Sequence, residues 1–111
     1  MINVVVIRQN QTIKTIEATG HSGYAEEGQD IVCSAVSTLM TTLANGLTEI
    51  VKAKVDVKVD EEIPHLSVTL KETDKEKCKL AQVLMSSTLL GIKSVAQEFS
   101  KFIKIKEKQN D

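Results

Sequence analysis

The order of apolar and polar positions predicts four β-strands. A β-branched run from Ile2 to Arg8 is typical of a central strand covered on both faces. Asn10 and Gln11 mark a turn, and the segment from Thr12 to Thr19 is again rich in β-formers, so the two segments predict a hairpin. Further along, residues 54–60 and 65–70 alternate apolar and polar side chains, which predicts two half-buried strands.

Two long helices are predicted by apolar residues at helical spacing. The first begins behind Asp30, a good N-cap residue, and runs from about Ile31 to Val51. The second begins at a capping box formed by Thr73 and Glu76. Its buried stripe is expected to contain Met85, Leu89, Ile92, Ala96, Phe99 and Ile103.

The element order β-β-α-β-β-α predicts a single α+β domain over residues 1–111, in which two long helices pack on a mainly antiparallel sheet. The first helix is unusual because no charged residue occurs between Asp30 and Glu49. A helix without charge is rarely solvated on all of its outer face. We therefore expect it to be covered on more than one side, with the sheet and a second copy of the chain as the candidate covers.

Composition narrows the function classes. The 14 basic residues are balanced by 15 acidic ones and aromatic residues make up 3%, which argues against direct nucleic-acid binding. The amino terminus shows no basic leader, and hydroxyl residues make the uncharged stretch from Ile31 to Thr48 too polar for a membrane span. We expect a cytoplasmic protein whose two cysteines remain reduced.

Cys33 and His21 are the candidate catalytic pair. Cys33 is the third residue after the proposed cap Asp30, in the first helical turn, where unpaired backbone N–H groups favour a thiolate. His21 stands at the start of a glycine-containing loop that can fold back toward the helix. Each residue also has a plain structural interpretation, Cys33 as a small buried side chain and His21 as a loop residue bonded to backbone.

Asp30 is interpreted first as a helix cap and second as a group that orients the imidazole. A zinc site built from both histidines and both cysteines is disfavoured because no pair has the spacing of a structural zinc motif. No cofactor or metal is expected.

Two features of the last helix are given structural roles. Cys78 shares a helical stripe with Met85 and Ile92 and is expected in or near the core. The lysines of residues 101–108 are expected to form the basic end of the helix.

The segment GHSGYAEEGQDIVCSAVS resembles the signature of the bacterial ribosomal-processing cysteine protease (Prp, YsxB-like) family. The family pattern has a Gly-His pair after a strand, a glycine-bearing loop and an Asp-x-Val-Cys run that opens a helix. The matching residues here are Gly20, His21, Gly28, Asp30, Val32 and Cys33. Ser22 and Ser34 stand where many relatives are expected to have alanine, which leaves both catalytic groups in place.

The resemblance implies a cysteine endopeptidase in which Cys33 is the nucleophile and His21 the general base. The implied substrate is the short N-terminal extension of a ribosomal large-subunit protein, and the implied assembly is a homodimer. Asp30 and Ser34 would support the site. The loop around Gly20, Ser22, Gly23, Tyr24 and Gly28 would contact the substrate and close over it.

In the expected reaction, the Cys33 thiolate attacks the peptide carbonyl and the protonated imidazole of His21 releases the amine. The backbone N–H groups of Cys33 and Ser34 are the first candidates to stabilise the oxyanion, and loop amides near Gly28 are the alternative. Two other function classes stay open: a non-catalytic ribosome-associated assembly module, and another thiol enzyme such as an acyl transferase.

Overall fold

The computed structural model describes residues 1–20, 29–60 and 65–110, without the side chains of residues 29 and 30. Five strands, two long helices and one π-helical turn follow one another in this part of the chain. They are β1 (Ile2–Gln9), β2 (Thr12–Thr19), α1 (Gln29–Asn45), η1 (Gly46–Val51), β3 (Val55–Asp60), β4 (His65–Leu70), α2 (Lys75–Glu98) and β5 (Ile103–Gln109). The predicted α+β class, with two helices on a mainly antiparallel sheet, is confirmed.

The strands form one sheet in the order β3-β4-β2-β1-β5. All neighbours pair antiparallel except β1 and β5, which run parallel. The predicted hairpin between β1 and β2 is confirmed, and Asn10 has a positive φ of 60° at its turn. Asparagine tolerates this left-handed conformation better than most residues do, which explains why the chain reverses there.

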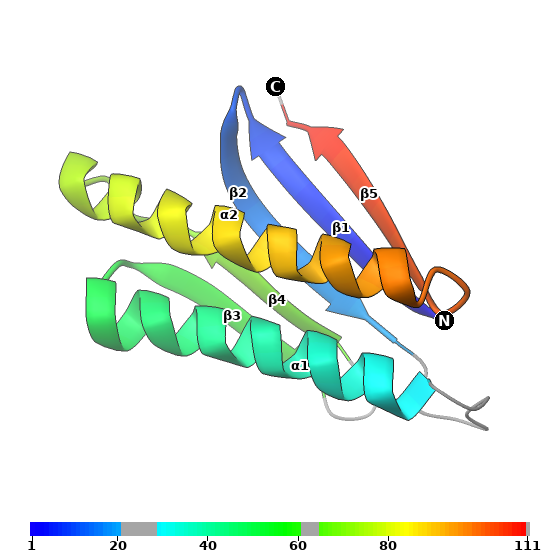
Figure 1. The fold of residues 1–111 in the computed structure, drawn as a ribbon. Coiled ribbons are helices and arrows are strands. Elements are labelled where there is room, and N and C mark those ends of the chain that lie inside the picture. Colours follow the sequence, from blue (N-terminus) through cyan, green and yellow to red (C-terminus); the bar gives the residue numbers. More distant parts are fainter. Residues whose placement is uncertain (21–28, 61–64, 111) are drawn as a thin grey trace.

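Both helices lie side by side on one face of the sheet (Figure 1). Ile2, Val4 and Val6 of β1 point into the layer between helices and sheet and are buried. Val5 and Ile7 point to the opposite face and are only partly buried. The prediction that the first strand is covered on both faces is therefore wrong for the described residues, because no described helix lies on that second face.

The first helix is the main structural element of the candidate site. Residues 31–51 pass the length and composition test for a membrane-spanning helix, with a mean hydropathy of 1.3, contrary to the expectation from their hydroxyl groups. The inner stripe of this segment is fully buried in the domain, at Val32, Val36, Met40, Leu43 and Leu47. We therefore assign it as the core helix of a globular domain.

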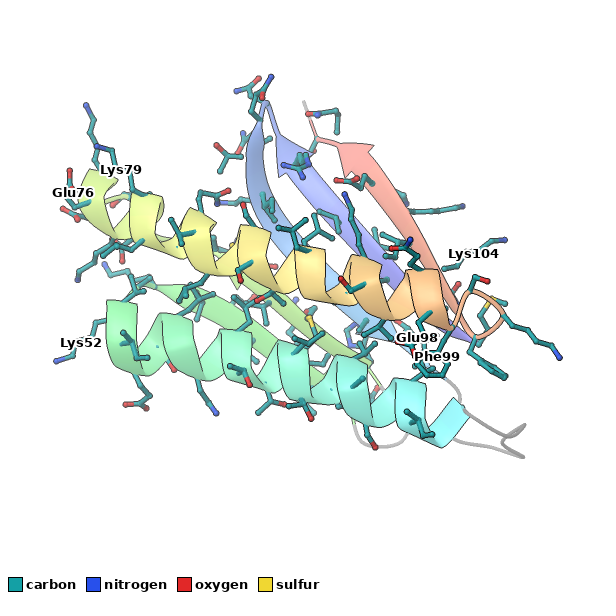
Figure 2. The ribbon with its side chains drawn as sticks, viewed as in Figure 1. Lys52, Glu76, Lys79, Glu98, Phe99 and Lys104 are labelled. Carbon is teal, nitrogen blue, oxygen red and sulfur yellow. The ribbon has the colours of Figure 1, made fainter. Side chains whose placement is uncertain are left out.

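The outer face of α1 carries no charged side chain from Ile31 to Asn45. The side chains of Ser34, Ser37, Thr38, Thr41 and Thr42 are exposed. Of the charged residues labelled in Figure 2, Lys52, Glu76, Lys79 and Glu98 lie near the ends of the helices and Lys104 lies on β5. The expectation that a second copy covers this face stays a prediction.

The sequence interpretation missed the fifth strand. The last helix ends at Glu98, and Ile103 begins β5 instead of completing the helical stripe. Residues 103–109 alternate inward and outward side chains, so Ile103 is buried while Lys104 and Lys106 are exposed. The predicted basic helix end is consequently wrong. The missed signal was a change in the spacing of apolar residues, from the 3.6 of a helix to the two of a strand. No glycine or proline separates the two segments.

Charged contacts fix β5 in its place beside β1. Glu107 accepts a hydrogen bond from Nε of Arg8 at 3.0 Å, and Nζ of Lys93 on α2 lies 3.4 Å from its other carboxylate oxygen. The hydrogen bond from Arg8 is the main reason that the pKa of Glu107 is lowered. The pairing joins the final strand to both the sheet and the second helix.

The second helix begins one residue later than the predicted capping box requires. Asp74 is the N-cap, and its Oδ2 accepts a hydrogen bond from the N–H of Lys77 at 3.1 Å. Thr73 instead donates its N–H to Glu72 at 3.1 Å, so the proposed pairing of Thr73 with Glu76 is not the cap. Aspartate caps slightly better than threonine.

Glu72 connects the starts of β3 and α2. Its carboxylate accepts N–H groups from Asp74 at 3.0 Å and from Lys54 at 2.8 Å, and these bonds lower its pKa from 4.5 to about 2. Since the folded pKa lies below the unfolded one, the carboxylate stabilises the fold above about pH 4.5 and this contribution disappears as the pH falls toward 2.

The variant Glu72→Gln should therefore unfold at a lower temperature than wild type at neutral pH. The difference between the two midpoints should shrink steadily below about pH 4.5. Thermal unfolding followed by circular dichroism from pH 7 to pH 2.5 measures it. A difference that is constant over this range would show that the carboxylate charge has no part in the connection.

Candidate active site

A pocket of about 530 Å³ opens between α1 and one end of the sheet. The end of the sheet is formed by the start of β1, the end of β2, the end of β3 and the start of β4, which meet because neighbouring strands run in opposite directions. Its wall on the helix side is formed by Cys33, Val36, Ser37, Met40 and Thr41. The volume is within the range of small-molecule and peptide side-chain sites.

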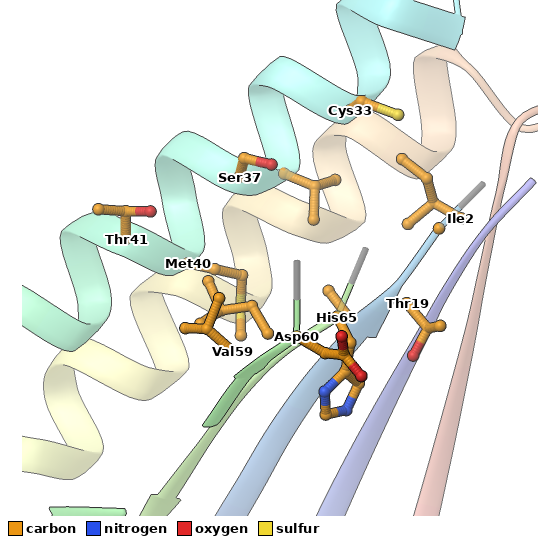
Figure 3. Close-up of a pocket in the computed structure, with 13 residues that line it drawn as sticks. Ile2, Thr19, Cys33, Ser37, Met40, Thr41, Val59, Asp60 and His65 are labelled. Carbon is orange, nitrogen blue, oxygen red and sulfur yellow. The ribbon is translucent and has the colours of Figure 1, made fainter. Parts of the chain in front are cut away.

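Cys33 lies at one end of this pocket. Figure 3 shows Cys33, Ser37 and Thr41 following one another along the flank of α1, with the sulfur of Cys33 directed toward Ile2. Cys33 is partly buried and forms no disulfide. Cys33 lines the pocket and also packs against the hydrophobic core, so its role as nucleophile and its plain structural interpretation both stay predictions.

The start of α1 changes one detail of the expected chemistry. The helix begins at Gln29, so Asp30 is its second residue and Cys33 its fifth. In an α-helix the N–H groups from the fifth residue onward donate to carbonyl groups four residues earlier. The backbone N–H groups of Cys33 and Ser34 are thus engaged in the helix, contrary to their expected role as oxyanion donors.

Gly20 brings the end of β2 to the same pocket. A Cβ atom at this position would lie 3.0 Å from Cγ1 of Ile2, a contact so short that the isoleucine would have to move. Glycine therefore allows the chain to leave β2 in close contact with the start of β1. His21 is the next residue in the chain, and it lies outside the described residues.

The other predicted loop residues also lie outside the described part of the chain, namely Ser22, Gly23, Tyr24 and Gly28. The side chain of Asp30 is outside it as well, so its role in orienting the imidazole stays a prediction. Its predicted role as N-cap is wrong, because α1 begins at Gln29 and Asp30 lies inside the helix. Ser34 is described and exposed, next to Cys33 on α1. No contact among the described residues supports its predicted role in the site.

His65 is the one histidine that the described residues contain, and it borders the pocket. Its imidazole turns away from Cys33 in Figure 3, and its Nε2 atom lies 3.1 Å from a carboxylate oxygen of Glu17. A base for Cys33 must reach its sulfur directly or through one water. His65 in this conformation is therefore not that base.

The sequence interpretation missed most of the residues that line the pocket. Met40, Val59 and Leu66 form its apolar surface, with Ser37 and Thr41 at its rim. Ser37 and Thr41 were detectable in principle, because residues four and eight positions after Cys33 lie on the same helix flank. Val59 and Leu66 were not, since only the sheet pairing brings them to Cys33.

Cys78 is partly buried at the start of α2, where its sulfur donates a hydrogen bond to the carbonyl oxygen of Glu72 at 3.3 Å. Cys78 is not among the described side chains that pack against the hydrophobic core, so its predicted place in or near the core stays a prediction. Across residues 1–20, 29–60 and 65–110, no three histidine, cysteine or acidic side chains gather as metal ligands would.

Comparison with known sequences decides the family. The sequence model of the family described as cysteine protease Prp matches residues 1–104. The chain belongs to the Prp family. It is accordingly a cysteine protease, and the resemblance seen in the segment around Cys33 extends over almost the whole chain.

Several Prp relatives have been named individually. The ribosomal processing cysteine protease Prp of Mycoplasma pneumoniae is 31% identical over 86% of this chain and 89% of its own length. The protein of the same name from Bacillus subtilis is 22% identical over 95% of this chain and 96% of its own length.

Solved structures agree with the fold. SMU.848 from Streptococcus mutans superposes with a TM-score of 0.87 at 32% identity, covering 99% of this chain and 96% of that one. The Prp protease of S. aureus, solved in complex with a substrate peptide, superposes with a TM-score of 0.85 at 19% identity over 96% of this chain and 99% of that one. The five-stranded sheet with two helices is therefore the Prp fold.

Proposed function

We propose that this protein is an endopeptidase that removes the short N-terminal extension of a ribosomal large-subunit protein, with Cys33 as nucleophile and His21 as general base. The observation that carries the proposal is the position of Cys33, whose thiol faces an open pocket on the flank of α1. The relatives from Bacillus subtilis and Mycoplasma pneumoniae are named ribosomal processing cysteine proteases, which supports the choice of a ribosomal substrate.

The neighbourhood of Gly20 supports the assignment of His21. Gly20 and Cys33 line the same pocket, and successive Cα atoms are about 3.8 Å apart across a trans peptide bond. Gly20, the residue directly before His21 in the sequence, thus lines the pocket that contains the thiol, which supports the choice of His21 as the base. His65, the other histidine of the chain, is engaged with Glu17.

The reaction follows from these two groups. His21 takes the thiol proton, and the sulfur of Cys33 forms a bond to the carbonyl carbon of the substrate. The imidazolium then protonates the nitrogen as the C–N bond breaks, which releases the amine product. Water activated by His21 hydrolyses the thioester and restores the thiol. Backbone N–H groups outside the regular part of α1 stabilise the oxyanion, since those of Cys33 and Ser34 are used by the helix.

The pocket also limits which substrates fit. Its surface beyond Cys33 is mainly apolar, formed by Val36, Met40, Val59 and Leu66. A hydrophobic side chain placed there would lose its contact with water and gain about 1.5–3 kcal/mol. The proposed substrate therefore carries a large apolar residue close to the bond that is cut.

We also propose that the protein is a cytoplasmic homodimer. The uncharged outer face of α1, with its exposed threonines and serines, is the kind of surface that a two-fold related copy covers without burying charge. A mass of twice 12.2 kDa by light scattering is the expected result, and a monomeric mass at micromolar concentration would contradict it.

A cleavage assay tests the proposed activity. The purified protein is incubated with the N-terminal peptide of the large-subunit protein from the same organism, including its extension, and the products are identified by mass. One cut at a fixed bond beside an apolar residue is expected. A scrambled peptide of the same composition is the control. An intact peptide together with tight binding would favour the non-catalytic assembly module, and transfer of an acyl group to an added amine would favour the acyl transferase.

A further inference from the structure

The outer edge of β3 carries backbone groups without a partner strand. β3 is the first strand of the sheet and pairs only with β4 in the part of the chain that the structure describes. Such an edge presents N–H and C=O groups that can pair with another extended chain. The sheet also has an edge at β5, but that strand is rich in exposed lysines, a common protection against strand addition.

The register shows which residues of β3 face the free edge. Just before the strand, Lys71 donates its N–H to the carbonyl oxygen of Lys54 at 2.8 Å. In an antiparallel pair, residues that exchange hydrogen bonds alternate with residues that do not. Asp56 and Lys58 therefore bond to β4, while the backbone groups of the intervening residues, Val55, Val57 and Val59, point outward.

The same edge leads to the candidate active site. Val59 lines the pocket that contains Cys33, and Figure 3 shows Val59 across the pocket from the flank of α1. Val57 and Val59 are 37% and 66% exposed, unusually open for valines in a strand. The pocket and the free edge therefore form one continuous surface, which leads from the thiol to three valines whose outward backbone groups pair with no other strand of the described residues.

We propose that the peptide substrate binds partly as an added strand on the free edge of β3, with its main chain hydrogen-bonded to Val57 and Val59, and then crosses the pocket to Cys33. The proposal rests on the proposed function and states how the substrate is held. Strand addition gives affinity through main-chain hydrogen bonds, and alternate side chains face a common surface. We expect the side chains of the bound peptide that face the pocket to be apolar, and the side chains that alternate with them to be polar.

A proline at position 57 tests the proposal. Proline has no N–H and is tolerated on an edge strand where that group faces outward. Val57→Pro should keep the bonds to β4 and remove one donor from the free edge. We expect KM for the extended peptide to rise about tenfold while kcat stays similar, because one main-chain hydrogen bond to the bound peptide is lost.

Two further variants serve as controls. Val57→Thr keeps the N–H and the branched shape, so it should retain the KM of wild type. Lys58→Pro removes an N–H donor that bonds to β4 and should lower the unfolding midpoint. Val57→Pro should lower this midpoint much less. An unchanged KM in folded Val57→Pro overturns the proposal.

Shortened and N-methylated peptides provide a second readout. Peptides are shortened residue by residue from each end, and those that no longer reach β3 should be cut equally well by wild type and Val57→Pro. If Val57→Pro is too unstable to assay, N-methylation at alternate positions of the peptide should raise KM with a period of two, and the absence of this alternation overturns the proposal.

Other outcomes separate this proposal from its alternatives. If wild type does not cut the peptide, the proposed function is wrong, and so is the proposed binding of a substrate that depends on it. If Val57→Pro changes the mass measured by light scattering but leaves KM unchanged, the edge pairs with a second copy of the chain and the substrate proposal is wrong.

Discussion

Replacing Cys33 by alanine is expected to abolish cleavage of the extended ribosomal peptide, with a loss of at least about 10⁴-fold in kcat/KM. In the proposed reaction the thiol forms the covalent bond to the substrate, and the next hydroxyl that lines the pocket, that of Ser37, lies one helical turn further along α1. The measurement is the mass-based assay with single-turnover amounts of enzyme.

The matched control for this prediction is Cys78→Ala. Cys78 is the second free thiol and is partly buried at the start of α2, where it bonds to the carbonyl of Glu72. The variant should cleave the peptide as wild type does once its fold is verified by circular dichroism. Retained cleavage by Cys33→Ala, or loss of it in folded Cys78→Ala, would assign the chemistry to a different group.

Replacing His21 by alanine is expected to reduce kcat by about 10²–10⁴-fold, the usual contribution of a general acid-base residue. KM should change little, because in the proposed reaction the imidazole acts on protons in the transition state more than on the bound peptide. Small imidazole-like bases added to the buffer should restore part of the rate, which a merely structural histidine would not show.

His65 provides the comparison for this second prediction. It is paired with Glu17 and turned away from Cys33, so His65→Gln should reduce the rate far less than His21→Ala does. The reverse ranking of the two variants would identify His65 as the base and would require its ring to leave Glu17 in the complex with substrate.

Local sequence patterns were sufficient for most of the fold. The hairpin could be predicted because Asn10 separates two β-rich segments, and the first helix because its apolar residues recur at the right spacing. The final strand was missed, since Phe99 and Ile103 also fit the stripe of the helix before it. Only the pairing of β5 with β1 shows that a strand begins at Ile103.

The candidate site was less predictable than the fold. Cys33 could be selected from its place near the start of a helix and from the family signature around it. The pocket opposite Cys33 could not, because Val59 and Leu66 are distant in sequence and reach the site through the pairing of β3 with β4. Local sequence patterns also did not predict the exact first residue of α1. This residue decides which backbone N–H groups have no hydrogen bond within the helix.

The central claim is that Cys33 is a reactive thiol in an open pocket. Its most direct test is alkylation of the native protein by iodoacetamide, with the modified tryptic peptides quantified by mass over time. We expect Cys33 to be labelled much faster than Cys78, and the extended substrate peptide to slow the labelling of Cys33 alone. Equal, slow labelling of the two cysteines, unaffected by the peptide, would contradict the account.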